Sequence, residues 1–518
     1  MSVSLDEAPS PEGLGQRAAA GAVWMTGQKW VTLLTGLATV AILTRVLAPA
    51  DFGVVAAAST ILPLVYLLSD LGFSSYIVQV SETDNRMLST SFWFSAIVGI
   101  LLCLGLLTAA PLIAFVYNLP ALVPVLRVMT VSVGLAALGS VPTALLKRKM
   151  AFRALALQGS AAALVGQVVA VAATLSGAGV WALVAQTVVA QAVTTGAAWV
   201  NAGWRPSFTF SRAQFKDMVT FGGQVVGVDL IAFVRTWAET VIVASALGAV
   251  GLGYLAIAQR LIQVVQDVGA VALVQVSTVT FAKVRETPER LRNAYLRALT
   301  VAYAAVAPLL TFVAVAAGLI VPLLFGNQWG VSVPVAQGLG VAAILTLGAM
   351  VDQGLFYGTG HHSRWFWYAL VVDAATVGTT AIAVRYGLVG VAIGFVVVAF
   401  LATLIRWVLV GRLLQTSAGT VARPFVGISV PVALSAAAGF GVLVAVHSFP
   451  RLIAVACVGL TVLVVHLIGV RLVQPRVFVD MVTLLRLDRV RARMSHRVAR
   501  RSAGPAPTRT DSTTGRKH

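Results

Sequence analysis

The chain has 518 residues, of which 58% are hydrophobic and only 11% are charged, and its formal net charge is +19. Its mean hydropathy is +0.91. A soluble domain uses roughly 25% charged residues, so these values exclude a water-soluble enzyme or binding module. They predict an all-α protein that crosses a membrane many times. The two cysteines, Cys103 and Cys457, exclude a disulfide framework, and no Cys/His motif predicts a metal site or a cofactor.

Apolar segments long enough to span a bilayer follow one another along most of the chain. A spanning helix needs about 20 predominantly apolar residues. Fourteen segments meet this condition, at residues 20–46, 52–78, 90–117, 121–145, 155–175, 180–202, 217–246, 250–278, 294–318, 331–357, 364–384, 388–411, 424–446 and 452–471. The sequence therefore predicts about 14 transmembrane helices.

The basic residues between these segments predict the orientation of the chain. Loops after odd-numbered segments hold Arg45, Arg385 and Arg451. Loops after even-numbered segments hold many more: Arg86, Lys147, Arg148, Lys149, Arg153, Arg205, Arg212, Lys216, Lys283, Arg285, Arg290, Arg292, Arg297, Arg364, Arg406, Arg412 and Arg423. Because cytoplasmic loops are enriched in Lys and Arg, both termini are expected in the cytoplasm.

An internal repeat relates the first two segments to the seventh and eighth. "LAPADFGVVAAA" begins at Leu47, and "LGAVGLGYLAIA" begins at Leu247 with the same placement of Leu, turn and Gly. The "DLG" of residues 70–72 similarly resembles the "DVG" of residues 267–269. The copies lie six segments apart and so have the same orientation. Such a repeat predicts two pseudo-symmetric lobes with a binding site between them.

These observations predict the organisation of the chain from end to end. In order, we expect a cytoplasmic segment over 1–19, a six-helix lobe over 20–202, a cytoplasmic linker over 203–216, a second six-helix lobe over 217–411, two further helices over 412–471 and a basic cytoplasmic tail over 472–518. Within the tail, residues 479–501 suit a helix lying on the anionic inner leaflet, and a solvated disordered tail is the alternative.

Charged and amide side chains inside the apolar segments are the candidate functional residues. A charge at the bilayer centre costs about 2.5–3.5 kcal/mol, so such groups face a water-filled cavity or pair with one another. The candidate substrate-binding cations are Lys29, Arg45, Arg235 and Arg260. The candidate charge partners or ion-coupling acids are Asp70, Asp229, Glu239, Asp267, Asp352 and Asp373. The candidate cavity-lining amides are Gln28, Gln224, Gln259, Gln263 and Gln266.

Several of these residues also have a purely structural interpretation. Arg235 and Glu239 are four residues apart on one helix and could simply neutralise each other. Asp70, beside Gly72, could have only a structural role. Asp352 and Asp373 lack an intrahelical partner and could pair with Arg364 or with cations of the first lobe. No P-loop accompanies them, so the chain carries no recognisable ATPase of its own. Binding of a coupling H⁺ or Na⁺ is an alternative role for the acids, and no sequence feature decides the energy source.

The residues around the first repeat resemble a known family. Gly21, Trp24, "TRVLAPADFG" (44–53), "LSDLGFSSYIVQ" (68–79) and "VPTALLKRKMAFRALA" (141–156) resemble bacterial polysaccharide-unit flippases. These belong to the multidrug/oligosaccharidyl-lipid/polysaccharide exporter superfamily. The resemblance implies a multi-pass protein of the bacterial plasma membrane, not an enzyme. It would transfer an undecaprenyl-diphosphate-linked oligosaccharide from the inner to the outer leaflet by alternating access.

Other functions are compatible with parts of the sequence. A flippase for the lipid-linked peptidoglycan precursor would need similar cations. A cation-coupled multidrug exporter of the same superfamily would need acids to dominate its cavity, whereas acids and cations are evenly matched in the charged segments. A membrane polysaccharide polymerase or ligase would usually have a large extracytoplasmic loop, and none is predicted. A nucleic-acid partner is not indicated, because the positive charge follows the membrane topology.

Overall fold

The computed structural model describes residues 11–80 and 82–479, without the side chains of residues 11–20, 22, 224–229, 231–232 and 268–280. Within these ranges the chain forms α-helices, two short 3₁₀-helices and no strand, which confirms the predicted all-α fold. The predicted lipid-associated helix in the tail falls almost entirely within residues 480–518, outside the described residues.

Eight helices occupy the chain as far as Val284. In order they are α1 (Pro11–Val46), α2 (Pro49–Asp70), the short α3 (Phe73–Gln79), α4 (Asn85–Val116), α5 (Leu122–Arg148), α6 (Phe152–Leu175), α7 (Trp181–Ala202) and α8 (Arg212–Val284). As a straight rod, the 73 residues of α8 would measure about 110 Å, several times the roughly 30 Å of a hydrocarbon core. Gly248, with φ 69° and ψ −174°, breaks this helix into two crossings.

The remaining helices complete the bundle. They are α9 (Pro288–Leu324), η1 (Asn327–Trp329), α10 (Ser332–Thr346), α11 (Gly348–Gly358), α12 (His362–Ala383), η2 (Val384–Tyr386), α13 (Gly387–Leu413), α14 (Ala418–Ala445) and α15 (Arg451–Val473). Twelve described segments are long and apolar enough to cross a membrane. One of the twelve contains both α12 and α13, and another contains the Gly248 break of α8. Dividing each of these two segments into two gives fourteen crossings, the number predicted from the sequence.

Two of the predicted segments are not continuous helices. The segment 52–78 was expected to be continuous, but Leu71 and Gly72 take left-handed φ values of 46° and 71°, so the chain turns between α2 and α3. The segment 331–357 is divided at Leu347 into α10 and α11. Two helices extend beyond their apolar segments: α1 begins at Pro11 and α9 begins at Pro288, since proline is compatible with the first turn of a helix.

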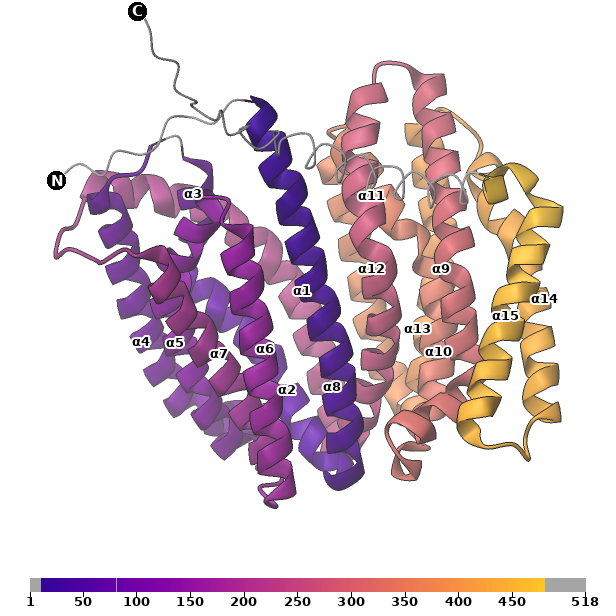
Figure 1. Cartoon of the computed structure of the whole chain (residues 1–518), viewed down its shortest axis with the longest axis horizontal. Helices are drawn as coiled ribbons and strands as arrows, with labels where there is room; N and C mark the ends of the chain where they lie inside the picture. Colours follow the sequence, from indigo (N-terminus) through magenta and orange to yellow (C-terminus); the bar gives the residue numbers. More distant parts are fainter. Residues whose placement is uncertain (1–10, 81, 480–518) are drawn as a thin grey trace, which may run out of the picture.

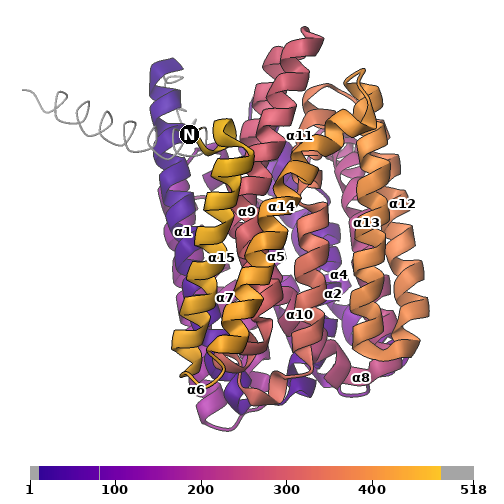
Figure 2. The same cartoon turned by 90° about the vertical axis from the view of Figure 1, so that its right-hand side faces the viewer.

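The helices gather into two groups with α14 and α15 at the edge of the second. Figure 1 shows α2 and α4–α7 on one side and α9–α13 on the other. Helix α1 packs on α6, and α2 packs along α8 across the boundary between the groups. Helices α14 and α15 pack on each other and on α9. Figure 2, turned by 90°, places them on the outside of the bundle.

The two groups cross most closely at the repeated motif. A Cβ atom on Gly53 would overlap the carbonyl oxygen of Ala249, and a Cβ atom on Gly253 would overlap the carbonyl oxygen of Pro49. Pro49 and Ala249 hold the same place in the two copies of the repeat, as do Gly53 and Gly253. The contact is therefore reciprocal, as expected for two halves related by a pseudo-two-fold axis.

A second set of contacts joins the groups at this same end, which we call the closed end. The buried indole of Trp329 lies between Phe52 and Tyr254, with ring centroids 5.2 and 5.7 Å away. Its Nε1 donates a hydrogen bond of 2.9 Å to the carbonyl oxygen of Thr44. The amide of Gln328 donates to the same oxygen. Aromatic packing and hydrogen bonds from side chains to a backbone carbonyl oxygen thus seal the two groups together here.

Candidate functional site

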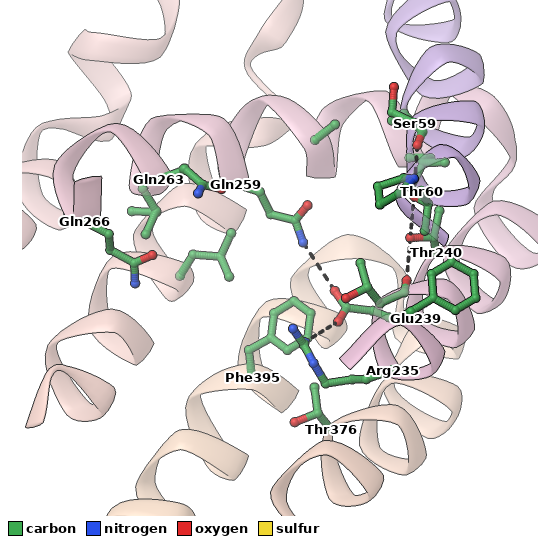
Figure 3. A pocket seen from close by; sticks show the side chains of 18 of the residues that line it. Ser59, Thr60, Arg235, Glu239, Thr240, Gln259, Gln263, Gln266, Thr376 and Phe395 are labelled. Carbon is green, nitrogen blue, oxygen red and sulfur yellow. Dashed lines mark hydrogen bonds and ion pairs between the residues drawn. The ribbon is translucent and has the colours of Figure 1, made fainter. Parts of the chain in front are cut away.

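A cavity of about 1000 Å³ lies at the boundary between the two groups. Helix α2 supplies one wall, both parts of α8 supply the next, and α10, α12 and α13 complete it. Figure 3 shows polar side chains from α2 and α8 converging on this space. The position agrees with the general expectation that a transporter with repeated lobes binds its substrate at their interface.

Hydroxyl and amide groups dominate the polar lining of the cavity. The hydroxyl-bearing residues are Ser59, Thr60, Thr236, Thr240, Thr346 and Thr376, and the amides are Gln259, Gln263 and Gln266. The Thr60 and Thr240 hydroxyls lie 3.3 Å apart and join α2 to α8 across the boundary. The three glutamines follow helical spacing on one face of α8. Phe233 and Phe395 add apolar surface.

One cluster of charged side chains reaches into this lining. Arg235 Nη1 lies 3.4 Å from Glu239 Oε2, and Arg235 Nε lies 3.1 Å from Asp373 Oδ1. Gln259 Nε2 donates to the other Glu239 oxygen at 3.3 Å. We call Arg235, Glu239 and Asp373 the arginine clamp. Two carboxylates thus hold one guanidinium, and the Glu239 side chain is only 9% exposed.

The neighbouring face of α8 is also polar but faces α1. Lys29 Nζ lies 3.2 Å from Asp267 Oδ1, which forms an ion pair between the two groups of helices. The Arg260 guanidinium lies beside Gly36 of α1. Consecutive residues of an α-helix point about 100° apart around its axis. This rotation separates Gln259 from Arg260 and Gln266 from Asp267. The amides therefore line the cavity, while Arg260 and Asp267 form the α1–α8 seam.

Three other predicted site residues lie elsewhere. Arg45 Nη2 donates to the carbonyl oxygen of Leu323 at 2.9 Å, at the closed end. Asp70 accepts hydrogen bonds from Ser74 at the turn between α2 and α3. The Gln28 amide packs where a Cβ on Gly159 of α6 would lie. None of these belongs to the described lining of the cavity. Gln224 and Asp229 are among the side chains that the structure does not describe.

A further ion pair lies inside the second group of helices. Arg406 Nε lies 2.9 Å from Asp352 Oδ2, and the two side chains are 2% and 1% exposed. Tyr295 donates a hydrogen bond to Asp352. Arg406 also donates to the carbonyl oxygens of Leu345 and Thr346, both at 3.3 Å, which the break between α10 and α11 leaves free.

The expected location of Arg406 in a cytoplasmic loop is wrong, because this residue is buried in α13. The sequence contained a signal for this burial, because Arg406 lies inside the predicted apolar segment 388–411. Sequence reasoning also missed the hydroxyl groups of the cavity. Ser and Thr are common in transmembrane helices, where they bond to their own backbone, so their presence does not distinguish a cavity.

The fold and the cavity define a polytopic membrane transporter built from two repeated lobes. A family model described as "Polysaccharide biosynthesis protein" matches residues 42–334, more than half of the chain. The chain therefore belongs to this family.

Two curated relatives have informative names. The chain is 28% identical over 362 residues to the succinoglycan biosynthesis transport protein ExoT of Rhizobium meliloti (strain 1021), covering 69% of this chain and 72% of ExoT. It is 24% identical over 400 residues to the lipopolysaccharide biosynthesis protein WzxC of Escherichia coli (strain K12), covering 74% of this chain and 80% of WzxC.

Solved structures share the fold. The lipid II flippase MurJ in an inward closed conformation superposes with a TM-score of 0.70 at 13% identity, over 87% of this chain and 98% of MurJ. An inward-facing multidrug resistance MATE family transporter superposes with a TM-score of 0.60 at 20% identity, over 74% of this chain and 94% of the transporter. At these identities the likeness concerns the fold alone.

Proposed function

We propose that this protein moves a lipid-linked oligosaccharide from the inner to the outer leaflet of the bacterial plasma membrane by alternating access. The observation that carries the proposal is the hydroxyl- and amide-rich cavity between two repeated lobes that are sealed at one end. A hydrophilic headgroup needs such a compartment to pass a hydrocarbon layer of about 30 Å. The names of the relatives, which concern succinoglycan and lipopolysaccharide biosynthesis, agree with a saccharide cargo.

We assign a separate place to each part of this substrate. The saccharide would occupy the cavity, where hydroxyl and amide groups can exchange hydrogen bonds with sugar hydroxyls. The diphosphate would bind at the α1–α8 seam, where Lys29 and Arg260 supply positive charge. Charge-assisted hydrogen bonds to phosphate are strong in surroundings of low dielectric constant and would offset the dehydration of the diphosphate.

A wholly apolar groove offers a place for the lipid tail. It has a volume of about 390 Å³ and lies between α8, α9 and α15. Leu261 and Val265 of α8 line it together with Phe312 of α9 and Val455 of α15. Gln263 and Gln266, on another face of the same helix, line the cavity. An isoprenoid chain in this groove would keep its contact with apolar surface while the headgroup crosses.

The orientation and the energy source belong to the same proposal. With both termini in the cytoplasm, the closed end faces the outside and the described state admits substrate from the inner leaflet. Opening the closed end while the opposite end closes would release the headgroup outside. A gradient of H⁺ or Na⁺ would drive the cycle through the carboxylates of the arginine clamp, which are the acids nearest the cavity.

Transport in proteoliposomes tests this function. A polyprenyl-diphosphate oligosaccharide with a labelled terminal sugar would be loaded into vesicles, and its transfer between leaflets followed by access of a membrane-impermeant enzyme to the label. We expect the protein to accelerate transfer and Arg260→Ala and Lys29→Ala to slow it at least tenfold. Arg127→Ala, on an exposed part of α5, serves as the matched control. If the protein did not accelerate transfer relative to protein-free vesicles, the proposed function would be contradicted. If it preferred the lipid-linked peptidoglycan precursor, that precursor would replace the oligosaccharide as the proposed substrate.

A further inference from the structure

Helix α9 contains an interior proline, and a neighbouring helix supplies the hydrogen bond that this proline removes. Pro308 has no N–H, so the carbonyl oxygen of Ala304, four residues earlier, loses its usual helical partner. The Nε2 atom of His466 in α15 lies 3.2 Å from that oxygen. A carbonyl oxygen can only accept, so Nε2 carries the proton and donates it. Because His466 is fully buried and an unsatisfied carbonyl is costly in hydrocarbon, this bond stabilises the contact between α15 and α9.

The first group of helices contains the same arrangement. Pro142 in α5 removes the N–H that would bond the carbonyl oxygen of Leu138. The indole Nε1 of Trp199 in α7 donates a hydrogen bond of 3.0 Å to that oxygen. In both groups, a side chain of an adjacent helix thus satisfies a carbonyl oxygen that an interior proline leaves free.

The hydrogen bond of His466 belongs to a longer contact between α15 and α9. Gly459, about two turns before His466, lies against the ring of Phe312, about two turns after Ala304. The two helices therefore run antiparallel. A Cβ atom on Gly459 would lie 3.1 Å from Cε2 of Phe312, closer than an ordinary contact. The glycine thus lets the aromatic ring approach α15, and the register of the two helices decides where the ring lies.

This contact borders the apolar groove between α8, α9 and α15. Three residues that closely follow Pro308 line the groove: Leu309, Phe312 and Val313. On the other side, the described lining includes Val455 of α15. Val455, Gly459 and His466 are spaced by four and seven residues, so they share one face of α15. The face that lines the groove is therefore the face that His466 bonds to α9.

We propose that His466 is a positioning residue of the lipid-tail groove. Its bond to the Ala304 carbonyl oxygen holds α15 in register with α9 and thereby shapes the apolar surface offered to an isoprenoid chain. This inference rests on the proposed function and gives a role to α15, which lies on the outside of the bundle (Figure 2). Loss of the bond is expected to weaken recognition of the lipid tail and to spare recognition of the headgroup.

A comparison of a complete ligand with a lipid-free one tests this role. The transfer assay gives the KM of a polyprenyl-diphosphate oligosaccharide. A water-soluble analogue with a methyl group in place of the polyprenyl chain, used as an inhibitor, gives the Ki of the headgroup. His466→Leu should raise the KM at least fivefold and leave kcat and Ki within twofold of the parent values. His466→Gln keeps an N–H donor at similar reach, so its KM should stay close to the parent value.

A double-mutant cycle with Pro308 tests the hydrogen bond itself. Pro308→Ala returns the backbone N–H, so the carbonyl oxygen of Ala304 no longer depends on His466. His466→Leu should therefore lower the thermal unfolding temperature by several degrees in the parent protein and by much less in Pro308→Ala. Trp199→Phe is the matched control, because it removes the donor at the other proline, away from the groove. It should leave the KM unchanged.

Each result separates the positioning role from the transport function. A parallel rise of KM and Ki in His466→Leu, or an unchanged KM, would overturn the positioning role and leave the transport function standing. An equal loss of unfolding temperature in both backgrounds would overturn the hydrogen bond. If His466→Leu alone did not fold, recovery of folded protein by Pro308→Ala would support the bond, and no recovery would overturn it. Failure of the parent protein to transfer the polyprenyl compound would overturn the proposed function itself.

Discussion

Gly53 and Gly253 occupy the same position in the two halves of the repeat, and each packs against the backbone of the other's helix. The carbonyl oxygens of Ala249 and Pro49 fill the space that a Cβ atom would need. Because the obstructing atoms belong to backbone, no side-chain rotation can make room. This crossing therefore sets how closely α2 and α8 approach at the closed end.

The first prediction concerns this crossing. Gly53→Ala and Gly253→Ala should each force α2 and α8 apart and lower the thermal unfolding temperature in detergent by several degrees. Gly105→Ala in α4, where the new methyl group meets no atom within 4 Å, should not lower it. If both crossing variants unfolded at the parent temperature, the two helices would not be in close contact in the protein.

A second prediction addresses the buried pair of Asp352 and Arg406. Arg406→Met leaves a buried carboxylate without its partner, which typically costs about 3–5 kcal/mol. The double variant Arg406→Met with Asp352→Asn removes both charges and keeps an acceptor for Tyr295. It should therefore unfold at a higher temperature than the single variant. The reverse order in a thermal scan would show that the charge pair does not stabilise the break between α10 and α11.

The ion pair across the α1–α8 seam gives a third prediction. Lys29→Asp places two acids together and should reduce transfer more than Lys29→Ala does. Exchanging the charges, with Lys29→Asp and Asp267→Lys in one chain, should recover part of the activity because the attraction is restored. Transfer assays at equal protein content measure both effects. If the charge-exchanged protein transferred substrate no faster than Lys29→Asp alone, the attraction between the two residues would not be sufficient. The positive charge would then be needed at position 29 itself.

A fourth prediction separates packing from hydrogen bonding at the closed end. Trp329→Phe keeps an aromatic ring between Phe52 and Tyr254 but removes the donor to the Thr44 carbonyl oxygen. Trp329→Ala also leaves a large void, and truncation of a buried Trp costs about 3–5 kcal/mol. We expect the Ala variant to unfold well below the Phe variant in a thermal scan. Equal unfolding temperatures would mean that the ring contributes little to the seal.

Much of the architecture could be predicted from sequence because it depends on local patterns. Segment length and hydropathy predicted the fourteen crossings, and the Leu47 and Leu247 repeat predicted two pseudo-symmetric lobes. The packing of α2 on α8 at that repeat came from the structure. The turn at Leu71 was missed because a left-handed Leu has no composition signal. The break at Leu347 was missed for a similar reason, since its free carbonyls are satisfied by Arg406, which is distant in sequence.

The site itself was harder to predict because it depends on helix rotation. Consecutive residues of α8, Gln259 and Arg260, face different compartments, and no sequence pattern states which face meets the cavity. Sequence spacing anticipated that Arg235 could pair with Glu239, four residues away. The third member of the clamp, Asp373, lies on α12 and reaches Arg235 only in the folded bundle. Long-range ion pairs of this kind require the tertiary structure.

The location of the sugar is the central claim, and photo-cross-linking measures it directly. A polyprenyl-diphosphate oligosaccharide with a diazirine on its terminal sugar would be irradiated with the protein in vesicles, and the labelled peptides would be identified by mass spectrometry. The account predicts labels on the cavity faces of α2 and α8, around Thr60 and Gln259, and competition by the unlabelled compound. Labels confined to α14 and α15, or labels that the unlabelled compound does not displace, would contradict it.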